Sequence, residues 1–165
     1  MHNSLFFTLL ASLDAPKFAR FWTPISYFIA IVADWTFPIF RYNVKPLARI
    51  LGFVDSAQEP TDWPTSPAIG IKKLLQDLKL KPDDIDAYEI NEAFSVVVLA
   101  NAKILGLDLD KVNVNGGAIG IGHPFGMSGA RITNHLVHSL KEGQIGIASL
   151  CNGGGGASTI AIQKL

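Results

Sequence analysis

The stretch from Val112 to Gly129 has the sequence VNVNGGAIGIGHPFGMSG, which holds six glycines and a single histidine. Glycine lacks a Cβ atom, so it adopts positive φ angles and lets another group approach the main chain closely. His123, the only histidine of this stretch, lies between Gly122 and Pro124, where the backbone path is restricted. The stretch therefore predicts either a tight structural loop with an incidental histidine or a turn that presents His123 to a ligand.

The composition is that of a globular protein large enough for one ordinary domain. The 165 residues are 48% apolar and 17% charged. Basic and acidic residues balance at 14 each, so no overall field attracts nucleic acid, and we expect no nucleic-acid partner. The only cysteine, Cys151, excludes an internal disulfide and fits a reducing compartment. No metal-binding or phosphate-loop motif occurs, so we predict no metal site.

Residues 1–43 differ in composition from the rest of the chain. They hold 11 of the 16 aromatic residues and none of the 15 glycines. The run 21–40 carries one charge, Asp34, and is long enough to cross a bilayer, but that aspartate and two prolines oppose a membrane span. The segment matches neither a signal peptide nor a transit peptide. We treat it as an apolar, aromatic-rich leader of unknown role, with membrane attachment through 21–40 as the less favoured alternative.

Strand and helix patterns alternate over residues 44–165, which we interpret as the folded domain. The expected strands are 47–54, 85–90, 112–115, 144–150 and 157–163, and the expected helices are 68–78, 91–105 and 128–141. The order βαβαβαββ predicts an α/β fold with a mixed, largely parallel five-stranded sheet and helices on both faces. The helix over 91–105 is apolar on nearly every side, so we expect it to need burial all round.

Three polar residues each follow a predicted strand: Asn91, His123 and Cys151. Ligands of open α/β sheets bind at the carboxyl ends of strands, so we expect these side chains to converge. An imidazole and a thiol together are suited to proton transfer. The glycines at 153–156 leave backbone N–H groups unobstructed, as the binding of an oxyanion requires. The three residues therefore predict a site that handles charge on a carbonyl group.

Each of these residues also has a structural interpretation. Asn91 falls where asparagine is favoured as a helix N-cap. Cys151 at a strand end is often a buried, small apolar residue. The glycines at 153–156 are also compatible with a loose hairpin. His135 and His138, on the expected third helix, are predicted to be surface residues.

Four motifs occur in a fixed order along the chain: Asn91-Glu92-Ala93-Phe94, Asn113-Val114-Asn115-Gly116-Gly117-Ala118, Gly122-His123-Pro124 and Cys151-Asn152-Gly153-Gly154-Gly155. Together they resemble the C-terminal half of thiolases, most of all the acetoacetyl-CoA thiolases, over about residues 44–165. The resemblance implies Claisen condensation of two acetyl-CoA molecules to acetoacetyl-CoA and CoA, and the reverse thiolysis, through an acyl-cysteine. It also implies a coenzyme A thioester as substrate, no tightly bound cofactor, and a homo-oligomer for the intact family enzyme.

The resemblance further implies roles for individual residues. His123 would activate a nucleophilic cysteine, and Asn91 would hold a water that binds the thioester oxygen. Cys151 would be the general acid/base, with the Gly153 N–H in the second oxyanion hole. Phe94 would line the acyl and pantetheine pocket.

The loop around Trp63 would line the same pocket. The nucleophilic cysteine of the family lies in its N-terminal half, whereas Cys151 occupies the acid/base position. We therefore expect a truncated thiolase that is inactive alone. We also expect the helix from Ser128 to expose the surface that packs on the other half, so that the chain self-associates.

Two alternatives stay open beside this hypothesis. The first is a non-catalytic thiolase-fold protein that acts by binding, attached to a membrane through 21–40 or paired with a full-length subunit. The second is a β-ketoacyl synthase, which shares the fold but uses two histidines where this chain has Asn91 and His123. Mitochondrial and cytosolic thiolases share these motifs, so either compartment is compatible with the sequence.

Overall fold

The structure is a computed structural model that describes residues 45–165 of the chain. The leader 1–43 and the candidate membrane span 21–40 lie outside the described residues. In the described part, none of the helices combines the length and the apolar character that crossing a membrane requires.

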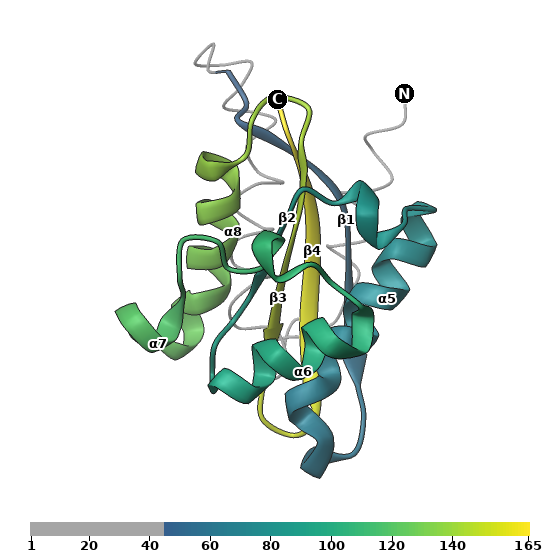
Figure 1. Ribbon diagram of the computed structural model, residues 1–165, viewed down its shortest axis with the longest axis vertical. Helices are drawn as coiled ribbons and strands as arrows, with labels where there is room; N and C mark the ends of the chain where they lie inside the picture. Colours follow the sequence, from purple (N-terminus) through teal and green to yellow (C-terminus); the bar gives the residue numbers. More distant parts are fainter. Residues whose placement is uncertain (1–44) are drawn as a thin grey trace, which may run out of the picture.

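Four strands form one mixed sheet: β1 (Ala48–Ala57), β2 (Ala87–Ile90), β3 (Ile145–Cys151) and β4 (Gly156–Lys164). Their order across the sheet is β1-β4-β3-β2 (Figure 1). Only β2 and β3 are parallel, whereas β4 is antiparallel to both β3 and β1. The mixed α/β class is confirmed, but the prediction that the sheet is largely parallel is wrong. The short turn between β3 and β4 forces them to be antiparallel, because parallel neighbours need a long crossover.

The predicted strand 112–115, the third of the five, is reduced to a single bridge. Val112 pairs in parallel with Tyr88, and Asn113 then takes a φ of 48°, which turns the chain away. The Asn113 side chain makes the bonds that a further strand would make. Its Nδ2 donates to the Ile90 carbonyl and its Oδ1 accepts from the Ile90 N–H, both at 2.8 Å. The side-chain amide of Asn113 thus takes the place of the backbone hydrogen bonds of a further strand. The glycine-rich loop begins at this residue.

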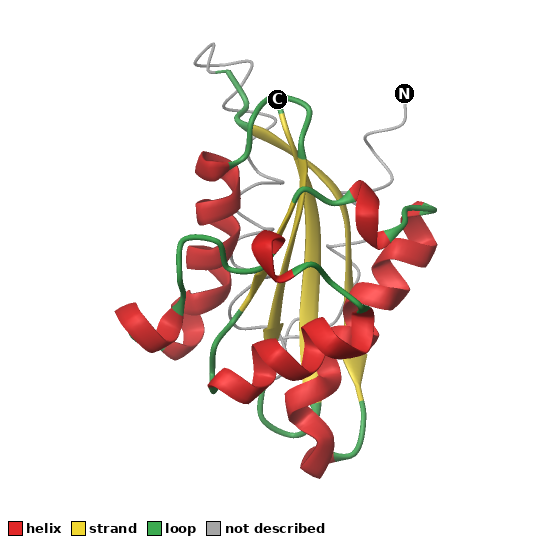
Figure 2. Cartoon of the chain, viewed as in Figure 1, coloured by secondary structure: helices red, strands yellow, loops and turns green. Residues whose placement is uncertain are grey.

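Helices cover both faces of the sheet, as predicted (Figures 1 and 2). On one face lie α5 (Ser66–Leu78) and α6 (Ser95–Leu105), and on the other lies α8 (Ser128–Ser139). Short helical turns complete the described part: η1 (Pro60–Thr65), η2 (Pro82–Asp84), η3 (Leu109–Lys111), α7 (Ala118–Ile121) and η4 (Phe125–Met127).

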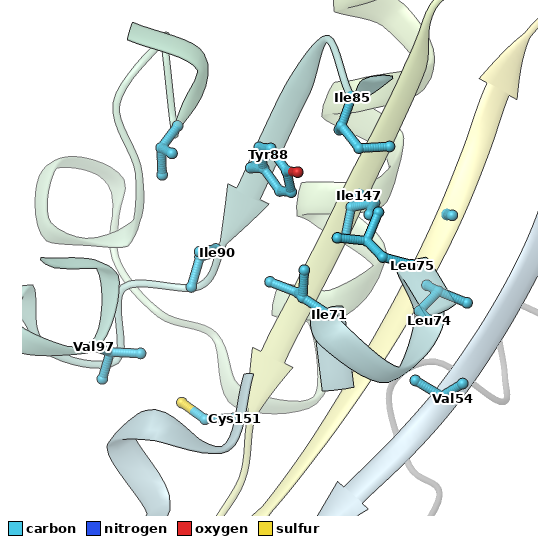
Figure 3. Close-up of a cluster of buried hydrophobic side chains, with 12 residues drawn as sticks. Val54, Ile71, Leu74, Leu75, Ile85, Tyr88, Ile90, Val97, Ile147 and Cys151 are labelled. Carbon is cyan, nitrogen blue, oxygen red and sulfur yellow. The ribbon is translucent and has the colours of Figure 1, made fainter. Parts of the chain in front are cut away.

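Two apolar clusters hold these layers together. On the first face, Ile71, Leu74 and Leu75 of α5 pack with Tyr88 and Ile147 of the sheet (Figure 3). On the second face, α8 packs on β3 and β4 through a separate set of buried residues, namely Ile132, Leu136, Val137, Leu140, Ala148, Leu150, Ile160 and Ile162. Burial of each large aliphatic side chain contributes about 1.5–3 kcal/mol, so both layers are firmly attached.

Helix α6 is shorter and less buried than expected. It begins at Ser95 rather than Asn91, and only Val97, Asn101 and Ala102 are buried. Phe94 at its start and Val96, Leu99 and Ile104 along it are exposed. Burial all round is therefore not achieved within the described residues. The exposed apolar side lies on α6 rather than on the helix from Ser128, whose apolar residues are covered by the sheet.

Candidate active site

His123 is held from two different elements. Its Nε2 lies 3.3 Å from Nδ2 of Asn91, which follows β2, and its Nδ1 lies 2.6 Å from Oγ of Ser128, the first residue of α8. Since the amide nitrogen of Asn91 can only donate, Nε2 accepts and the proton of the neutral ring is on Nδ1. The ring centroid of Phe125 lies 5.3 Å away. This arrangement leaves Nε2 as the basic atom of the imidazole.

Asn91 faces the imidazole and is not a helix cap. Its side chain is buried, and its N–H donates to the Ser149 carbonyl at 3.0 Å, which continues the pairing of β2 with β3. The N-cap position of α6 is Phe94, so the N-cap interpretation of Asn91 is wrong. The strand ends with Asn91 pointed at His123.

Cys151 ends β3, the strand next to β2, and it is 6% exposed. It belongs to the apolar cluster on the α5 face, together with Ile90 and Val97 (Figure 3). Burial raises the pKa of the thiol to about 11, so it stays protonated at neutral pH. Within the described residues the thiol makes no side-chain hydrogen bond to His123. Cys151 thus lies at the same end of the sheet as Asn91, without direct contact to the imidazole.

The positions after Cys151 differ in whether the backbone there requires glycine. Gly154 and Gly155 have φ angles of 83° and 88°, and a Cβ on Gly155 would overlap the Gln58 carbonyl. The Gly155 carbonyl accepts from the Gln58 N–H at 3.0 Å. By contrast, Gly153 is exposed, and in the part of the chain described its N–H donates to no carbonyl. The hairpin needs Gly154 and Gly155, whereas the N–H of Gly153 has no carbonyl partner among residues 45–165.

Trp63 and Phe94 lie against each other. Their ring centroids are 5.8 Å apart with an angle of 57° between the planes. Trp63 belongs to η1 and is half-buried, whereas Phe94, just before α6, is 62% exposed. The pair presents an aromatic surface to solvent.

Glu92 anchors the glycine-rich loop, a role that the sequence analysis missed. Its Oε2 accepts from the Ile119 N–H at 2.8 Å, and Nδ2 of Asn113 lies 3.4 Å from its Oε1. A Cβ on Gly117 would come within 2.6 Å of the Glu92 carboxyl carbon, so a larger residue there would displace this carboxylate. The Gly116-Gly117 pair was the signal for this close approach.

Glu89 and His135 form a second contact between β2 and α8. Glu89 is 4% exposed, and its Oε1 lies 2.9 Å from Nδ1 of His135, whose Nε2 is 3.0 Å from Nδ2 of Asn115. Burial raises the pKa of Glu89 to about 7, although His135 opposes the shift. The prediction that His135 is a plain surface residue is wrong, whereas His138 is exposed. In the sequence, the indication of a partner for His135 was the carboxylate of Glu89 within an otherwise apolar strand.

A cavity of about 110 Å³ lies between these contacts. Glu89, Asn91, Ser128 and His135 all line it, beside residues of the glycine-rich loop. Within residues 45–165, no group of three or more His, Cys, Asp or Glu side chains is arranged to hold a metal ion.

The described residues thus form an α/β domain with an Asn–His contact at the carboxyl end of its parallel strand pair and a buried cysteine at the same end of the sheet. Residues 44–164 match the family described as "Thiolase, C-terminal domain", so the chain belongs to the thiolase family. The mitochondrial acetyl-CoA acetyltransferase of Bos taurus is 62% identical over 125 residues, which are 76% of this chain and 30% of the bovine protein. The chain therefore spans about 30% of the length of this relative.

Solved structures have the same fold. The Acat5 thiolase from Ascaris suum, in complex with coenzyme A, has a TM-score of 0.75 and 48% identity, covering 77% of this chain and 33% of that one. Two structures of the peroxisomal thiolase of Saccharomyces cerevisiae have a TM-score of 0.75 and 38% identity, and cover 78% of this chain and 33% or 37% of theirs. The yeast enzyme is dimeric, and it is a five-layered α-β-α-β-α structure constructed from two core domains of identical topology.

Proposed function

We propose that this chain supplies the acid/base part of an acetyl-CoA C-acetyltransferase site, which joins two acetyl-CoA molecules to acetoacetyl-CoA and CoA and catalyses the reverse thiolysis. The observation that carries this proposal is the His123 imidazole held between Asn91 and Ser128 with Nε2 as its basic atom. Nε2 accepts the proton of a nucleophilic thiol, and the Nδ1–H bond to Ser128 fixes the ring for that transfer. Asn91, beside Nε2, holds a water against the thioester oxygen.

Cys151 is proposed as the second acid/base group. In thiolysis a protonated thiol gives its proton to the leaving enolate of acetyl-CoA, and the raised pKa of Cys151 keeps that proton in place at neutral pH. In synthesis the thiolate takes a proton from the acetyl methyl group, which requires that bound substrate or a further domain lower this pKa. The unobstructed N–H of Gly153 stabilises the enolate oxygen.

The acyl-accepting cysteine comes from outside these residues. The sequence holds one cysteine, and Cys151 is buried in an apolar cluster with its thiol protonated. When catalytic residues act together, removal of the nucleophile alone abolishes most of the rate of the catalysed reaction. We therefore expect the pure chain to be inactive, and a further core domain to supply the thiolate.

The substrate is proposed to be a coenzyme A thioester, with no tightly bound cofactor. The aromatic surface of Trp63 and Phe94 suits an acyl and pantetheine chain, because it is apolar and partly open to solvent. We propose a homo-oligomer for the assembled enzyme, as in the dimeric yeast relative, and a mitochondrial location, as in the bovine relative.

A second candidate function is binding without catalysis, by pairing with a thiolase subunit. The exposed apolar side of α6 favours it, because such surfaces mark sites of protein association. Turnover by an assembled chimera, described next, separates it from the catalytic proposal.

A chimera tests the catalytic proposal. Residues 45–165 of this chain replace the matching part of the bovine acetyl-CoA acetyltransferase, and thiolysis of acetoacetyl-CoA is measured. We expect turnover by the chimera, and a fall in kcat of roughly 10²–10⁴-fold for His123→Ala, the usual contribution of a general base. His138→Ala, on the exposed side of α8, is the matched control and should keep full activity.

Two outcomes would contradict the proposal. Sustained turnover by the pure 165-residue chain would mean that no outside cysteine is needed. A folded chimera in which His123→Ala is as active as the His138→Ala control would remove the imidazole from the reaction.

A further inference from the structure

We propose that Glu89 and His135 are positioning residues for His123, because they fix the distance between the two elements that hold its imidazole. This role rests on the proposed function, since it concerns the same imidazole. It adds two residues, outside the four motifs that define the site, to those that determine its geometry.

The position of His123 depends on how β2 and α8 lie relative to each other. Asn91 reaches its Nε2 from the end of β2, and Ser128 reaches its Nδ1 from the start of α8. A shift of either element lengthens one of these contacts. The tautomer of the ring is set by both contacts, so it responds to the same shift.

The Glu89–His135 contact also joins β2 to α8. It lies two residues before Asn91 along the β2 segment and seven residues after Ser128 along α8. Side chains two residues apart on a strand point to the same face, so Glu89 and Asn91 both face α8. Residues seven apart on a helix also share a face, so Ser128 and His135 both face β2. The 2.9 Å contact of Glu89 with His135 therefore spans the same gap as the contacts of His123.

A cavity lies beside the contacts of His123 and the Glu89–His135 contact. Its volume is about 110 Å³, and Glu89, Asn91, Ser128 and His135 all line it. The apolar residues of α8 pack mainly on β3 and β4, and Ala87 is the only β2 residue in that cluster within the described chain. Polar contacts therefore help to set the separation of β2 and α8 at the site, beside the apolar packing of α8 on the sheet.

His135 also restrains the loop that leads to His123. Its Nε2 accepts from Nδ2 of Asn115, so its neutral ring carries the proton on Nδ1 and donates it to Glu89. Glu89 acts as an acceptor in this arrangement. A glutamine at this position can accept the same bond through its amide oxygen, whereas alanine cannot.

The test reads the imidazole of His123 directly, in the full 165-residue chain labelled with ¹⁵N-histidine. Solution or solid-state NMR distinguishes the two neutral tautomers of each ring, so self-association does not interfere. In the unaltered chain we expect His123 to show one tautomer, with the proton on Nδ1. Glu89→Ala and His135→Ala should cause loss of this single-tautomer pattern, while Glu89→Gln restores it.

Two further variants keep the test decisive. His138→Ala, on the same helix but exposed, should leave the His123 signals unchanged. Asn115→Ala removes only the exposed end of the network, so it reports on the link if Glu89→Ala fails to fold. We expect it to broaden or shift the His123 signals without unfolding the chain.

The outcomes separate this inference from the proposed function. Two tautomers of His123 in the unaltered chain would contradict the geometry on which the proposed function depends. A single tautomer that persists in folded Glu89→Ala, His135→Ala and Asn115→Ala variants would overturn the positioning role alone. An equal change in the His138→Ala control would overturn it as well.

Discussion

Helices α6 and α8 are close in length, yet they are attached to the sheet in different ways. α8 has one apolar side, and the sheet covers it through residues such as Ile132 and Leu136. α6 is apolar on nearly every side, but only Val97 and Ala102 among its apolar residues are buried. The apolar side of α8 is therefore covered by the sheet of this chain. The exposed apolar side chains of α6, by contrast, form a surface on which another element could pack.

The largest effect should follow from a change in the α8 layer. Leu136→Ala removes a side chain that is 1% exposed and leaves a cavity. We expect the free energy of unfolding to fall by about 2–5 kcal/mol, measured by urea denaturation. A loss below 1 kcal/mol would mean that α8 is not held by its apolar side, and the comparison of the two helices would fail.

A smaller effect should follow from the polar anchor of α6. Asn101 is fully buried; its Oδ1 accepts from the Ala68 N–H at 2.6 Å and its Nδ2 donates to the Pro64 carbonyl at 2.7 Å. Asn101→Ala leaves both backbone groups without partners, so we expect a loss of about 1–3 kcal/mol in urea denaturation. Lys103→Ala, exposed on the same helix, is the control. Equal effects of the two changes would contradict an anchoring role for Asn101.

The α8 side should also show a pH dependence that α6 lacks. Burial raises the pKa of Glu89 from 4.5 to about 7, with His135 opposing the shift and Glu92 adding to it. The folded state then holds this proton more tightly than the unfolded chain. The contribution of Glu89 to stability is therefore fully present below about pH 4.5 and decreases as pH rises towards about 7.

We expect this decrease to be no more than about 3 kcal/mol, since the pKa moves from 4.5 to about 7 and one pKa unit corresponds to about 1.4 kcal/mol. Glu89→Gln should flatten it in denaturation curves recorded across this pH range. Arg131 and Glu92 line the same cavity, and they are unchanged in the variant. An unaltered slope in Glu89→Gln would assign the dependence to another group.

The smallest effect on stability should come from the open side of α6. Leu99 is 58% exposed, so Leu99→Lys should change the free energy of unfolding by no more than about 0.5 kcal/mol. It should nevertheless reduce self-association in sizing chromatography, because it places a charge within the apolar surface. Leu109→Lys, equally exposed but on η3, is the matched control. A sharp monomeric peak for the unaltered chain would contradict association through α6.

Regular periodicity explains which parts of the fold were predictable from the sequence. The spacing of Ile132, Leu136 and Val137 predicted α8 and its buried side, because an amphipathic helix determines its own orientation. The pattern of α6 could not reveal its partial exposure, since an apolar pattern on all sides does not show which side the rest of the fold covers. The strand at 112–115 was predicted from composition, and it failed because the side chain of Asn113 takes over the backbone pairing.

The candidate site was predictable only where a rule about strand ends applies. Asn91 follows a strand, and its contact with His123 agrees with that rule. Glu89 and His135 are separated by 46 residues, with no motif that joins them, so only the packing of β2 on α8 brings them together. The burial of Cys151 on the α5 face likewise depends on strand register rather than on its neighbours in sequence.

The amide of Asn113 has a consequence for how copies of this chain meet. The last strand of a sheet usually offers unpaired N–H and C=O groups to any passing strand, which is a route to fibrous aggregates. Here both outward backbone groups of Ile90 are occupied by one short side chain. At Ile90, the end of β2 is therefore blocked against pairing with a strand of another copy.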